Sequence, residues 1–460
     1  MTIDLLALTV DQQRGILRDA LGDRILFAGD AGYDDQRRPW NTAFDQRPFA
    51  VARPESAEDV VDAVRAAVAV GLRVAPQSTG HGAGALADTD LSDTVLMSLS
   101  RLRGVSIDPA TSTATVLGGS HWNDVLLVAA QHGLTALHGS AGDVSVAGYS
   151  LNGGLSFYAR AHGLAVNSVR AVELVTADGV IVRASATENT DLFWAVRGGS
   201  GSFGVVVSLE IALLPLADVF AGMLLWDASH TAEVTEAWAQ FAASAPESAT
   251  TALRVMNFPP MPELPPFLSG RSVVVVDGAI LESDAVAEGL LAPLRSLAPE
   301  IDTFSRIPAA ALVAVHMDPP DPTPSVNAHA VLSGFPADAV DTFVTVSATP
   351  GLFVTEIRHI GGAAARPASH GGAVSAIAGE FLLHTITVVP VPQARPGALA
   401  TVQAGAAAFT PWRTDALALT FIDGGADPRA GFGDAAERLS ELKEQFDPED
   451  VFAAARPVSR

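Results

Sequence analysis

A single histidine in a glycine-rich loop is the side chain whose surroundings point most clearly to chemistry. The loop follows a short apolar run and reads Pro76-Gln77-Ser78-Thr79-Gly80-His81-Gly82-Ala83-Gly84. Glycines let the backbone turn tightly and bring its N–H groups close to an anionic ligand. The loop therefore predicts a phosphate-bearing ligand within reach of His81, although a lone histidine in such a loop is more often an ordinary surface residue.

Two further glycine-rich stretches, 138–154 and 199–204, also lie beside expected strands. The stretch 199–204 matches the dinucleotide fingerprint G-x-G-x-x-G, which requires a strand before it and a helix after it. The residues that follow, 205–211, are instead β-branched and typical of a strand. A Rossmann domain is therefore not predicted. Together the three stretches indicate a cradle for one extended, phosphate-bearing cofactor.

The composition indicates a soluble globular chain of two domains. It has 460 residues, 48% of them hydrophobic, and a net charge of −23. This acidity argues against nucleic acid and anionic membranes as partners. The chain has no cysteine, which excludes disulfides and thiolate chemistry, and no spacing typical of metal ligands, so we predict no metal site. Without an evident leader or membrane span, we expect a cytoplasmic monomer or homodimer.

The periodicity predicts an α+β fold, with a first domain over residues 1–215 whose core begins near residue 45. Its expected helices are 9–21, 57–70 after the capping box that begins at Ser56, 122–133 and 190–195. Its expected strands are 48–52, 95–99, 113–117, 169–176, 180–184 and 205–214. Residues 216–409 are rich in proline and alternate strands with helices, which predicts an antiparallel sheet carrying helices. An apolar strand at 417–422 and a helix at 435–446 are expected to return, within 410–460, to the first domain.

Several longer motifs carry a resemblance to a known family. They are Val146-Ala147-Gly148-Tyr149-Ser150-Leu151-Asn152-Gly153-Gly154, Tyr158-Ala159-Arg160-Ala161-His162-Gly163-Leu164, Asp191-Leu192-Phe193-Trp194-Ala195-Val196-Arg197-Gly198-Gly199 and the C-terminal Phe446-Asp447-Pro448. With Gly80-His81, they resemble the berberine-bridge-enzyme-like branch of FAD-linked oxidases, in the vanillyl-alcohol-oxidase or PCMH-type superfamily. The resemblance implies an FAD domain of two small α/β subdomains and a substrate domain built on an antiparallel sheet.

The resemblance also implies roles for individual residues. His81 falls on the histidine that bonds covalently to the flavin 8α-methyl group, and Gln77 to Gly82 fall on the pyrophosphate loop. Bicovalent members add a cysteine where this chain has Ala141, so a single attachment is expected. The remaining expected cofactor contacts are Gly142, Asp143, Val144, Gly148, Asn152, Gly153, Gly163, Leu164, Gly201, Gly204 and Val206.

The C-terminal segment, where the family carries catalytic residues, departs from the family pattern. The usual Tyr-x-Asn falls on Ala418 and Thr420, a second common asparagine falls on Ala455, and no tyrosine follows Tyr158. Another group must then do the acid–base work. The candidates are Tyr149, beside the flavin loop, Glu356, which shares a strand face with Arg358, and His384. An ordinary ion pair explains Glu356 equally well, and a buried core position explains His384 equally well. His316 and Met317 are expected near the pocket.

These patterns predict an FAD-dependent oxidase. Its substrate would be a small or medium organic molecule such as a secondary metabolite, with hydride transfer to flavin N5 and electrons passed to molecular oxygen. The missing tyrosine leaves two alternatives: a flavin-holding enzyme that catalyses a non-redox cyclisation or elimination, and a degenerate binding protein.

Overall fold

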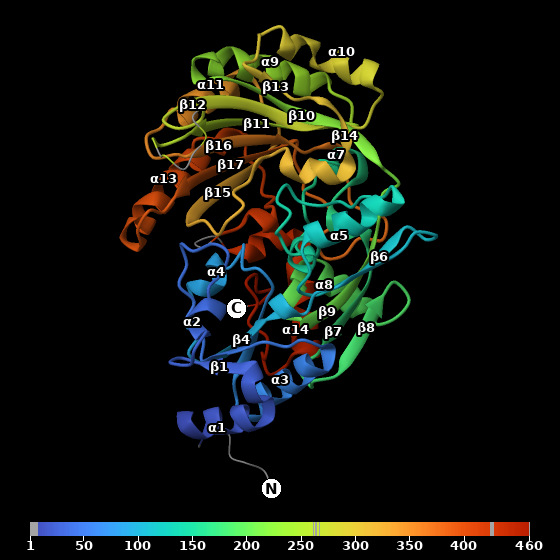
Figure 1. The fold of residues 1–460 in the computed structure, drawn as a ribbon, viewed down its shortest axis with the longest axis vertical. Coiled ribbons are helices and arrows are strands. Elements are labelled where there is room, and N and C mark those ends of the chain that lie inside the picture. Colours follow the sequence, from blue (N-terminus) through green and yellow to red (C-terminus); the bar gives the residue numbers. More distant parts are fainter. Residues whose placement is uncertain (1–7, 261, 263–264, 266, 424–426, 460) are drawn as a thin grey trace.

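Three sheets organise the chain, and the large one is displaced along the long axis from the two smaller ones (Figure 1). The computed structural model describes residues 8–260, 262, 265, 267–423 and 427–459. Two small sheets and their helices form the half that holds the N-terminus, and one large sheet with its helices forms the other half. Mixed helices and antiparallel sheets confirm the predicted α+β class.

A four-stranded sheet carries the His81 loop. Its order is β1-β2-β4-β3, with β1 antiparallel and the others parallel: Ile25–Phe27 (β1), Ala50–Ala52 (β2), Thr94–Ser98 (β4) and Arg73–Gln77 (β3). Its helices are α1 (Val10–Leu21), α2 (Tyr33–Gln36), α3 (Ala57–Ala69) and α4 (Gly84–Ala87). The predicted capping box at Ser56 forms and fixes where α3 begins, and a second capping box, at Thr9, fixes where α1 begins. The loop with His81 starts where β3 ends.

A five-stranded antiparallel sheet carries the other two glycine-rich stretches. In the order β5-β6-β9-β7-β8, its strands are Val105–Asp108, Thr113–Leu117, Val205–Ala212, Val169–Val175 and Ile181–Ser185. Strand β9 follows the G-x-G-x-x-G sequence directly, so the dinucleotide fingerprint has no helix after it, as predicted. The accompanying helices are α5 (Trp122–Ala129), α6 (Val146–Leu151), α7 (Ala159–His162) and α8 (Thr190–Gly199).

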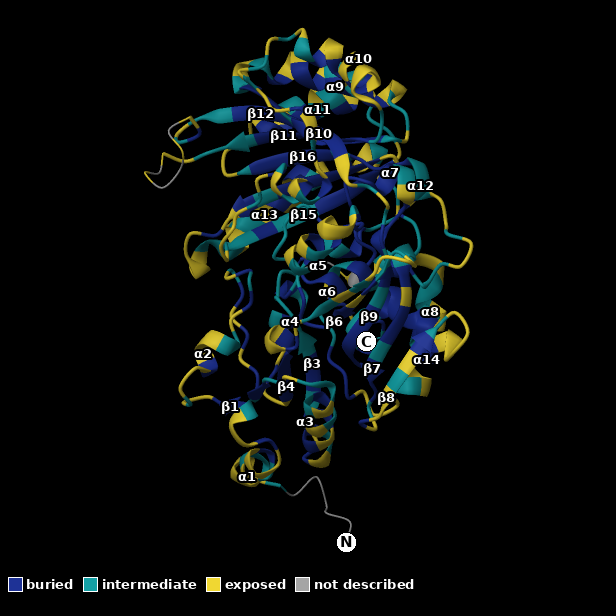
Figure 2. Ribbon diagram, turned by 45° about the vertical axis from the view of Figure 1, so that its right-hand side comes forward, coloured by how far each residue is buried: buried dark blue, intermediate teal, exposed yellow. Residues whose placement is uncertain are grey.

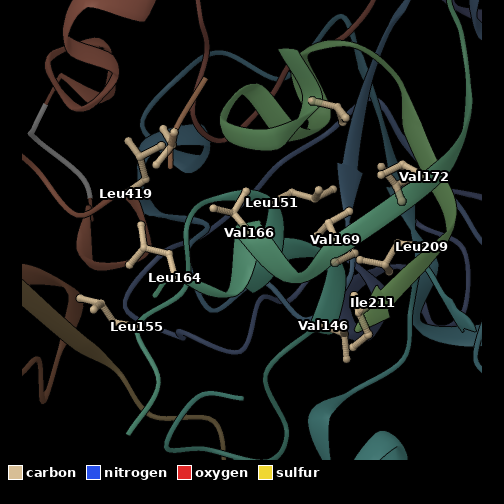
Figure 3. Packing of buried hydrophobic residues seen from close by; sticks show 14 of the residues in the cluster. Val146, Leu151, Leu155, Leu164, Val166, Val169, Val172, Leu209, Ile211 and Leu419 are labelled. Atoms are coloured by element: carbon tan, nitrogen blue, oxygen red, sulfur yellow. The ribbon is translucent and has the colours of Figure 1, made fainter. Parts of the chain in front are cut away.

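A hydrophobic core joins the short helix α6 to this sheet (Figure 3). Val146 and Leu151 of α6 belong to the same buried cluster as Val172 of β7 and Leu209 of β9. Burying such side chains stabilises the fold by about 1.5–3 kcal/mol each. The part of the glycine-rich stretch 138–154 that forms α6 is therefore held against the sheet, which fixes the position of the rest of the stretch.

The large sheet is antiparallel and forms the second half of the molecule. Its order is β13-β10-β12-β11-β16-β17-β15, and β14 also pairs with β10. The strands are Asp218–Asp227 (β10), Ala249–Asn257 (β11), Ser272–Ile280 (β12), Ile301–Asp302 (β13), Ser305–Pro308 (β14), Ser325–Leu332 (β15), Val354–His359 (β16) and Phe381–Val388 (β17). Its helices are α9 (Thr231–Ser244), α10 (Asp284–Arg295), α11 (Ala337–Ser347), α12 (Gly362–Ala365) and α13 (Arg395–Ala407).

The two faces of this sheet have different partners. Helices α9, α10 and α11 cover the outer face (Figure 1), where Ile357 and Leu383 join a cluster with Trp238 of α9. Successive strand residues point to opposite faces. Glu356 and His384, each next to one of these apolar residues, therefore lie on the inner face, toward the smaller sheets. Colouring by exposure shows that the central strands are buried on both faces (Figure 2).

The predicted strand at 417–422 is wrong. Leu419–Phe421 forms a turn of 3-10 helix, η11. In a strand, the backbone N–H and C=O groups of these residues would form hydrogen bonds with a neighbouring strand, whereas here several of them bond to side chains. The guanidinium of Arg456 donates to the carbonyl oxygens of Leu419 at 2.6 Å and Ile422 at 2.7 Å, and the Ala418 N–H donates to His329 at 3.1 Å.

The C-terminal segment packs against the first sheet. Helix α14 (Ala436–Phe446) forms close to its predicted position, and the backbone beyond it pairs with β3 through two hydrogen bonds between Val74 and the residues Val451 and Ala453. The domain boundaries at 215 and 409 stay predictions. Among the described residues, no helix is both long and apolar enough to cross a membrane.

Candidate cofactor and substrate site

A cavity of about 400 Å³ lies between the two halves of the molecule. All three glycine-rich stretches contribute to its wall, and so do side chains from β15, β16 and β17 on the inner face of the large sheet. The cavity therefore combines a wall that is mostly backbone with a wall of polar side chains. Sites for cofactors and their substrates commonly have this form and this location between domains.

The His81 loop brings its backbone to the cavity because two of its residues lack a Cβ. Gly80 has φ +77°, and a Cβ there would lie 2.7 Å from Pro39. A Cβ on Gly82 would lie 2.6 Å from Nη2 of Arg456, which also lines the cavity. A larger residue at Gly80 would need both a strained backbone and a displaced neighbour. The two glycines therefore let the loop pack closely against Pro39 and Arg456, while the approach of its backbone to an anionic ligand stays a prediction.

Most of the predicted cofactor residues line this one cavity. They are Gln77, Ser78, Thr79, Gly80, His81, Gly82, Ala141, Val144, Gly148, Asn152, Gly201, Gly204 and Val206. Five others lie outside its lining: Gly142, Asp143, Gly153, Gly163 and Leu164. Gly142 has a packing reason, because a Cβ there would lie 1.9 Å from the side-chain oxygen of Asn123. Asp143 contacts the cavity through His81, described below.

Buried polar atoms at the cavity fit the functional groups of FAD. Ser78 Oγ, the Tyr149 hydroxyl and Asn152 Oδ1 are buried and have no hydrogen-bond partner within the described structure. Such groups cost about 1–3 kcal/mol each unless something satisfies them. A ligand with phosphate oxygens and ring carbonyl and amide groups satisfies all of them, so the residues present fit an FAD molecule.

Tyr149 lies at the cavity as a neutral phenol. Burial raises the pKa of its hydroxyl, against a smaller opposite effect of Arg358. A phenol with a raised pKa stays protonated at neutral pH, so it donates a hydrogen bond and does not act as a base. Of the predicted catalytic candidates, Tyr149 is therefore suited to orienting a ligand.

The polar wall of the cavity ends in a buried network of charges centred on Glu356. Its Oε1 accepts a hydrogen bond from Nε of Arg358 at 2.9 Å, and Nη2 of Arg358 lies 3.1 Å from Nε2 of His316. Burial by itself would raise the pKa of Glu356, but Arg358 and His316 outweigh it and hold that pKa below its usual range. Glu356 is thus an ionised carboxylate behind the cavity wall.

His384 stands between this carboxylate and the cavity. Its Nδ1 lies 3.5 Å from Oε2 of Glu356, and its ring packs edge-on against Phe421 at 5.0 Å. Neither ring nitrogen has a hydrogen-bond partner within the described structure. Burial lowers the pKa of His384, with Glu356 acting in the opposite direction. A neutral imidazole that lines the cavity and is backed by a carboxylate has the arrangement of a general base.

The residues that pair with His316 behind this network were not predicted from the sequence. Asp277 of β12 accepts from His316 Nδ1 at 2.9 Å and is paired with Arg254 of β11. His316 is buried inside the network and does not line the cavity, while Met317 is exposed. A charged residue at an inner-face position of a buried strand, as at Arg254 and Asp277, is the signal that could have revealed them.

A comparison with protein families decides the identity of the first domain. Residues 48–185 match the model described as "FAD binding domain". These residues form an FAD-binding domain. They include the His81 loop and the stretch 138–154 but not the stretch 199–204, so the matched domain covers two of the three stretches of the predicted cradle.

Curated relatives agree over the same region. The chain is 34% identical over 204 residues to xylooligosaccharide oxidase of Thermothelomyces thermophilus and 36% identical over 203 residues to (R)-6-hydroxynicotine oxidase of Paenarthrobacter nicotinovorans. Each match covers 44% of this chain, and respectively 41% and 44% of the relative. Less than half of each relative is therefore matched.

Solved structures extend the likeness to the whole fold. BBE-like 1 of Physcomitrella patens has a TM-score of 0.83 at 20% identity, with 98% of this chain and 99% of that chain covered. The 6-hydroxy-D-nicotine oxidase from Arthrobacter nicotinovorans has a TM-score of 0.79 at 23% identity, with 93% and 96% covered. The fold that the resemblance implied is thus confirmed, and the FAD-binding domain rests on the match over residues 48–185.

Proposed function

We propose that this chain is an FAD-dependent oxidase of small or medium organic molecules, such as secondary metabolites. The observation that carries the proposal is the single cavity that joins the cradle of the FAD-binding domain to the polar inner face of the large sheet. When bound, FAD supplies a two-electron acceptor for a hydride, which molecular oxygen can reoxidise. The chain supplies binding, orientation and proton transfer.

His384 takes the role of the proton acceptor that the absent tyrosine has elsewhere in the family. A substrate hydroxyl or amine at the cavity wall gives its proton to Nε2, while Glu356 faces Nδ1 and stabilises the imidazolium that forms. Arg358 holds Glu356 in place and keeps it ionised. Tyr149 donates a hydrogen bond to the substrate or to the cofactor.

The substrate class follows from the same groups and from the names of the relatives. One relative is named for oxidising a hydroxylated sugar chain and another for oxidising a nicotine derivative. The cavity wall here offers a neutral base and a neutral hydroxyl donor beside the Arg358 guanidinium, with Asn327 nearby. A polar alcohol or an amine that fits about 400 Å³ together with the flavin ring agrees with these features.

His81 is proposed as a single covalent anchor of the flavin. It lines the cavity at the end of β3, and Ala141 lines the same cavity without a thiol that could form a second bond. Denaturation in acid should leave flavin colour on the polypeptide, and His81→Ala should release it. Colour that washes off the unmutated protein would contradict the bond but not FAD binding.

Anaerobic mixing with a panel of alcohols, oligosaccharides and amines tests the function. An oxidase substrate should bleach the flavin absorbance, and oxygen should restore it with release of hydrogen peroxide. Turnover of a substrate without bleaching would contradict the proposal and favour the non-redox cyclisation or elimination.

A further inference from the structure

Three side chains from separate parts of the sequence surround the His81 ring. The indole of Trp40 stacks on the imidazole, with ring centres 4.2 Å apart and planes 15° apart. Trp40 Nε1 donates to Oδ2 of Asp143 at 2.6 Å, and His81 Nε2 lies 3.5 Å from Oδ1 of the same carboxylate. Thr79 Oγ1 lies 2.9 Å from His81 Nδ1. Both ring nitrogens and one ring face therefore have defined neighbours.

A backbone hydrogen bond helps to hold these side chains in place. The Trp40 N–H donates to the Thr79 carbonyl at 2.9 Å, so the segment before β2 is tied to the glycine loop. Asp143 comes from the second glycine-rich stretch, beside α6. Burial by itself would raise the pKa of Asp143, but the nearby His81 and the hydrogen bond from Trp40 lower it, so the group is a carboxylate.

The arrangement selects one form of the imidazole. His81 Nε2 lies 3.5 Å from the Asp143 carboxylate and has no hydrogen-bond partner within the described structure. A carboxylate only accepts, so this approach favours the tautomer with the hydrogen on Nε2. Nδ1 then has the lone pair, toward which the Thr79 hydroxyl can donate. A neighbouring carboxylate that fixes the tautomer and orientation of a histidine also raises the electron density of its ring.

We propose that Asp143 and Trp40 are positioning residues that prepare His81 to form its bond to FAD. This inference rests on the proposed covalent anchor. In the net reaction a C–N bond forms between His81 and the 8α-methyl carbon, one methyl C–H bond and the imidazole N–H bond break, and molecular oxygen takes the two electrons and two protons and becomes hydrogen peroxide. Asp143 receives the proton that the imidazole loses, and Trp40 keeps the ring from turning.

The test measures covalent attachment directly, without turnover. Each variant is purified and incubated with FAD in air, and samples are precipitated in acid over time. Flavin in the pellet gives the covalent fraction, and flavin bound before precipitation gives total binding. We expect Asp143→Asn to bind FAD but to attach it about 10²-fold more slowly, at the low end of what a positioned base contributes. His81→Ala lacks the imidazole that forms the bond and therefore gives the background signal of the assay.

A matched pair of variants separates positioning from general structure. An asparagine has one accepting oxygen and one donating nitrogen, so it cannot accept from Trp40 and His81 together. Trp40→Phe keeps a stacked ring and removes the competing N–H donor. The double variant Trp40→Phe with Asp143→Asn should therefore attach FAD faster than Asp143→Asn alone.

The outcomes are distinguishable. Attachment by Asp143→Asn at the unmutated rate overturns the inference and leaves the His81 anchor intact. Loss of all flavin from the unmutated protein in acid overturns both the anchor and the inference. If the double variant is as slow as Asp143→Asn, the shared-acceptor argument is wrong and Asp143 does not act through the imidazole orientation.

Discussion

At the scale of single residues, the proposed function gives the role of the missing family tyrosine to a histidine backed by a carboxylate. Glu356 and His384 are on neighbouring strands, paired directly across the β16–β17 ladder. Cross-strand partners on one face lie about 4.5–5.5 Å apart at Cβ, so this contact is a consequence of register. The proposed base therefore belongs to the large sheet rather than to the C-terminal turn.

His384→Asn should slow flavin reduction by the substrate by about 10²-fold or more, because a positioned base contributes 10²–10⁴-fold. FAD binding should be unchanged. The measurement is the rate of bleaching in anaerobic stopped flow. His359→Asn is the matched control, since His359 is buried on the opposite face of β16 and packs against Phe381. An equal loss of rate in both variants would show a structural effect rather than a base.

The residue types alone predicted the candidates Tyr149, Glu356 and His384 but not their roles. His384 shares its pattern with core histidines of buried strands. Only the structure shows that it lines the cavity and that its nitrogens have no hydrogen-bond partner among the described residues. The network behind it, with Asp277 and Arg254, depends on pairing between strands distant in sequence, which no local pattern encodes.

At the scale of elements, the glycine loop after β3 is the part of the site most sensitive to small changes. Gly80→Ala should weaken FAD binding by about tenfold or more, because a strained backbone costs about 1–3 kcal/mol and 1.4 kcal/mol is a factor of ten. Titration of apoprotein with FAD measures this. Gly15→Ala, in α1 with nothing near its Cβ position, should bind FAD normally. Unchanged binding by Gly80→Ala would contradict the close backbone approach.

The two faces of the large sheet should respond differently to truncation. Ile357→Ala removes a fully buried side chain on the helix-covered face and should lower the free energy of unfolding by about 2–5 kcal/mol. The flavin spectrum should be unchanged, since Ile357 does not line the cavity. Urea denaturation measures the stability, and Val388→Ala, at an exposed position on β17, is the control. A changed flavin spectrum in Ile357→Ala would mean that the faces are not independent.

Elements with strong local signals were predictable, and the one with a weak signal was not. Capping residues at Thr9 and Ser56 marked the starts of α1 and α3. The apolar run at 417–422 predicted a strand, but Arg456 and His329 satisfy its backbone and allow a 3-10 turn instead. A distant side chain that satisfies a backbone group leaves no trace in the local pattern.

At the scale of the whole molecule, buried neutral histidines should make stability depend on pH. Burial lowers the pKa of His138 to about 4 and those of His329 and His359 to about 3. The unfolded chain, with histidine pKa values near 6.5, binds more protons than the folded chain between about pH 4 and 6.5. The free energy of unfolding therefore falls as the pH falls through this range, by about 1.4 kcal/mol per pH unit for each such histidine.

Urea denaturation at pH 7 and pH 5 should show this loss, and His359→Gln should make it smaller, because one of the buried groups is removed. His132→Gln, at an exposed position, should leave the difference between the two pH values unchanged. Equal stability at both pH values would contradict the neutral state of these histidines.

The architecture of two unlike halves followed from the sequence, but the cavity between them did not. Glycine-rich stretches and the family motifs predicted the FAD domain, and the alternation after residue 216 predicted the antiparallel sheet. The way the inner face of that sheet meets the glycine loops depends on contacts between halves, such as Asn41 with Ser325 at 2.9 Å. Such contacts join residues far apart in the chain.

The flavin content of the purified protein tests most directly whether this chain has an FAD site. We expect a yellow protein with one FAD per chain, either as purified or after incubation with FAD, and weaker FAD binding in Gly80→Ala. A protein that stays colourless after incubation with FAD would contradict the FAD site and every function proposed for it.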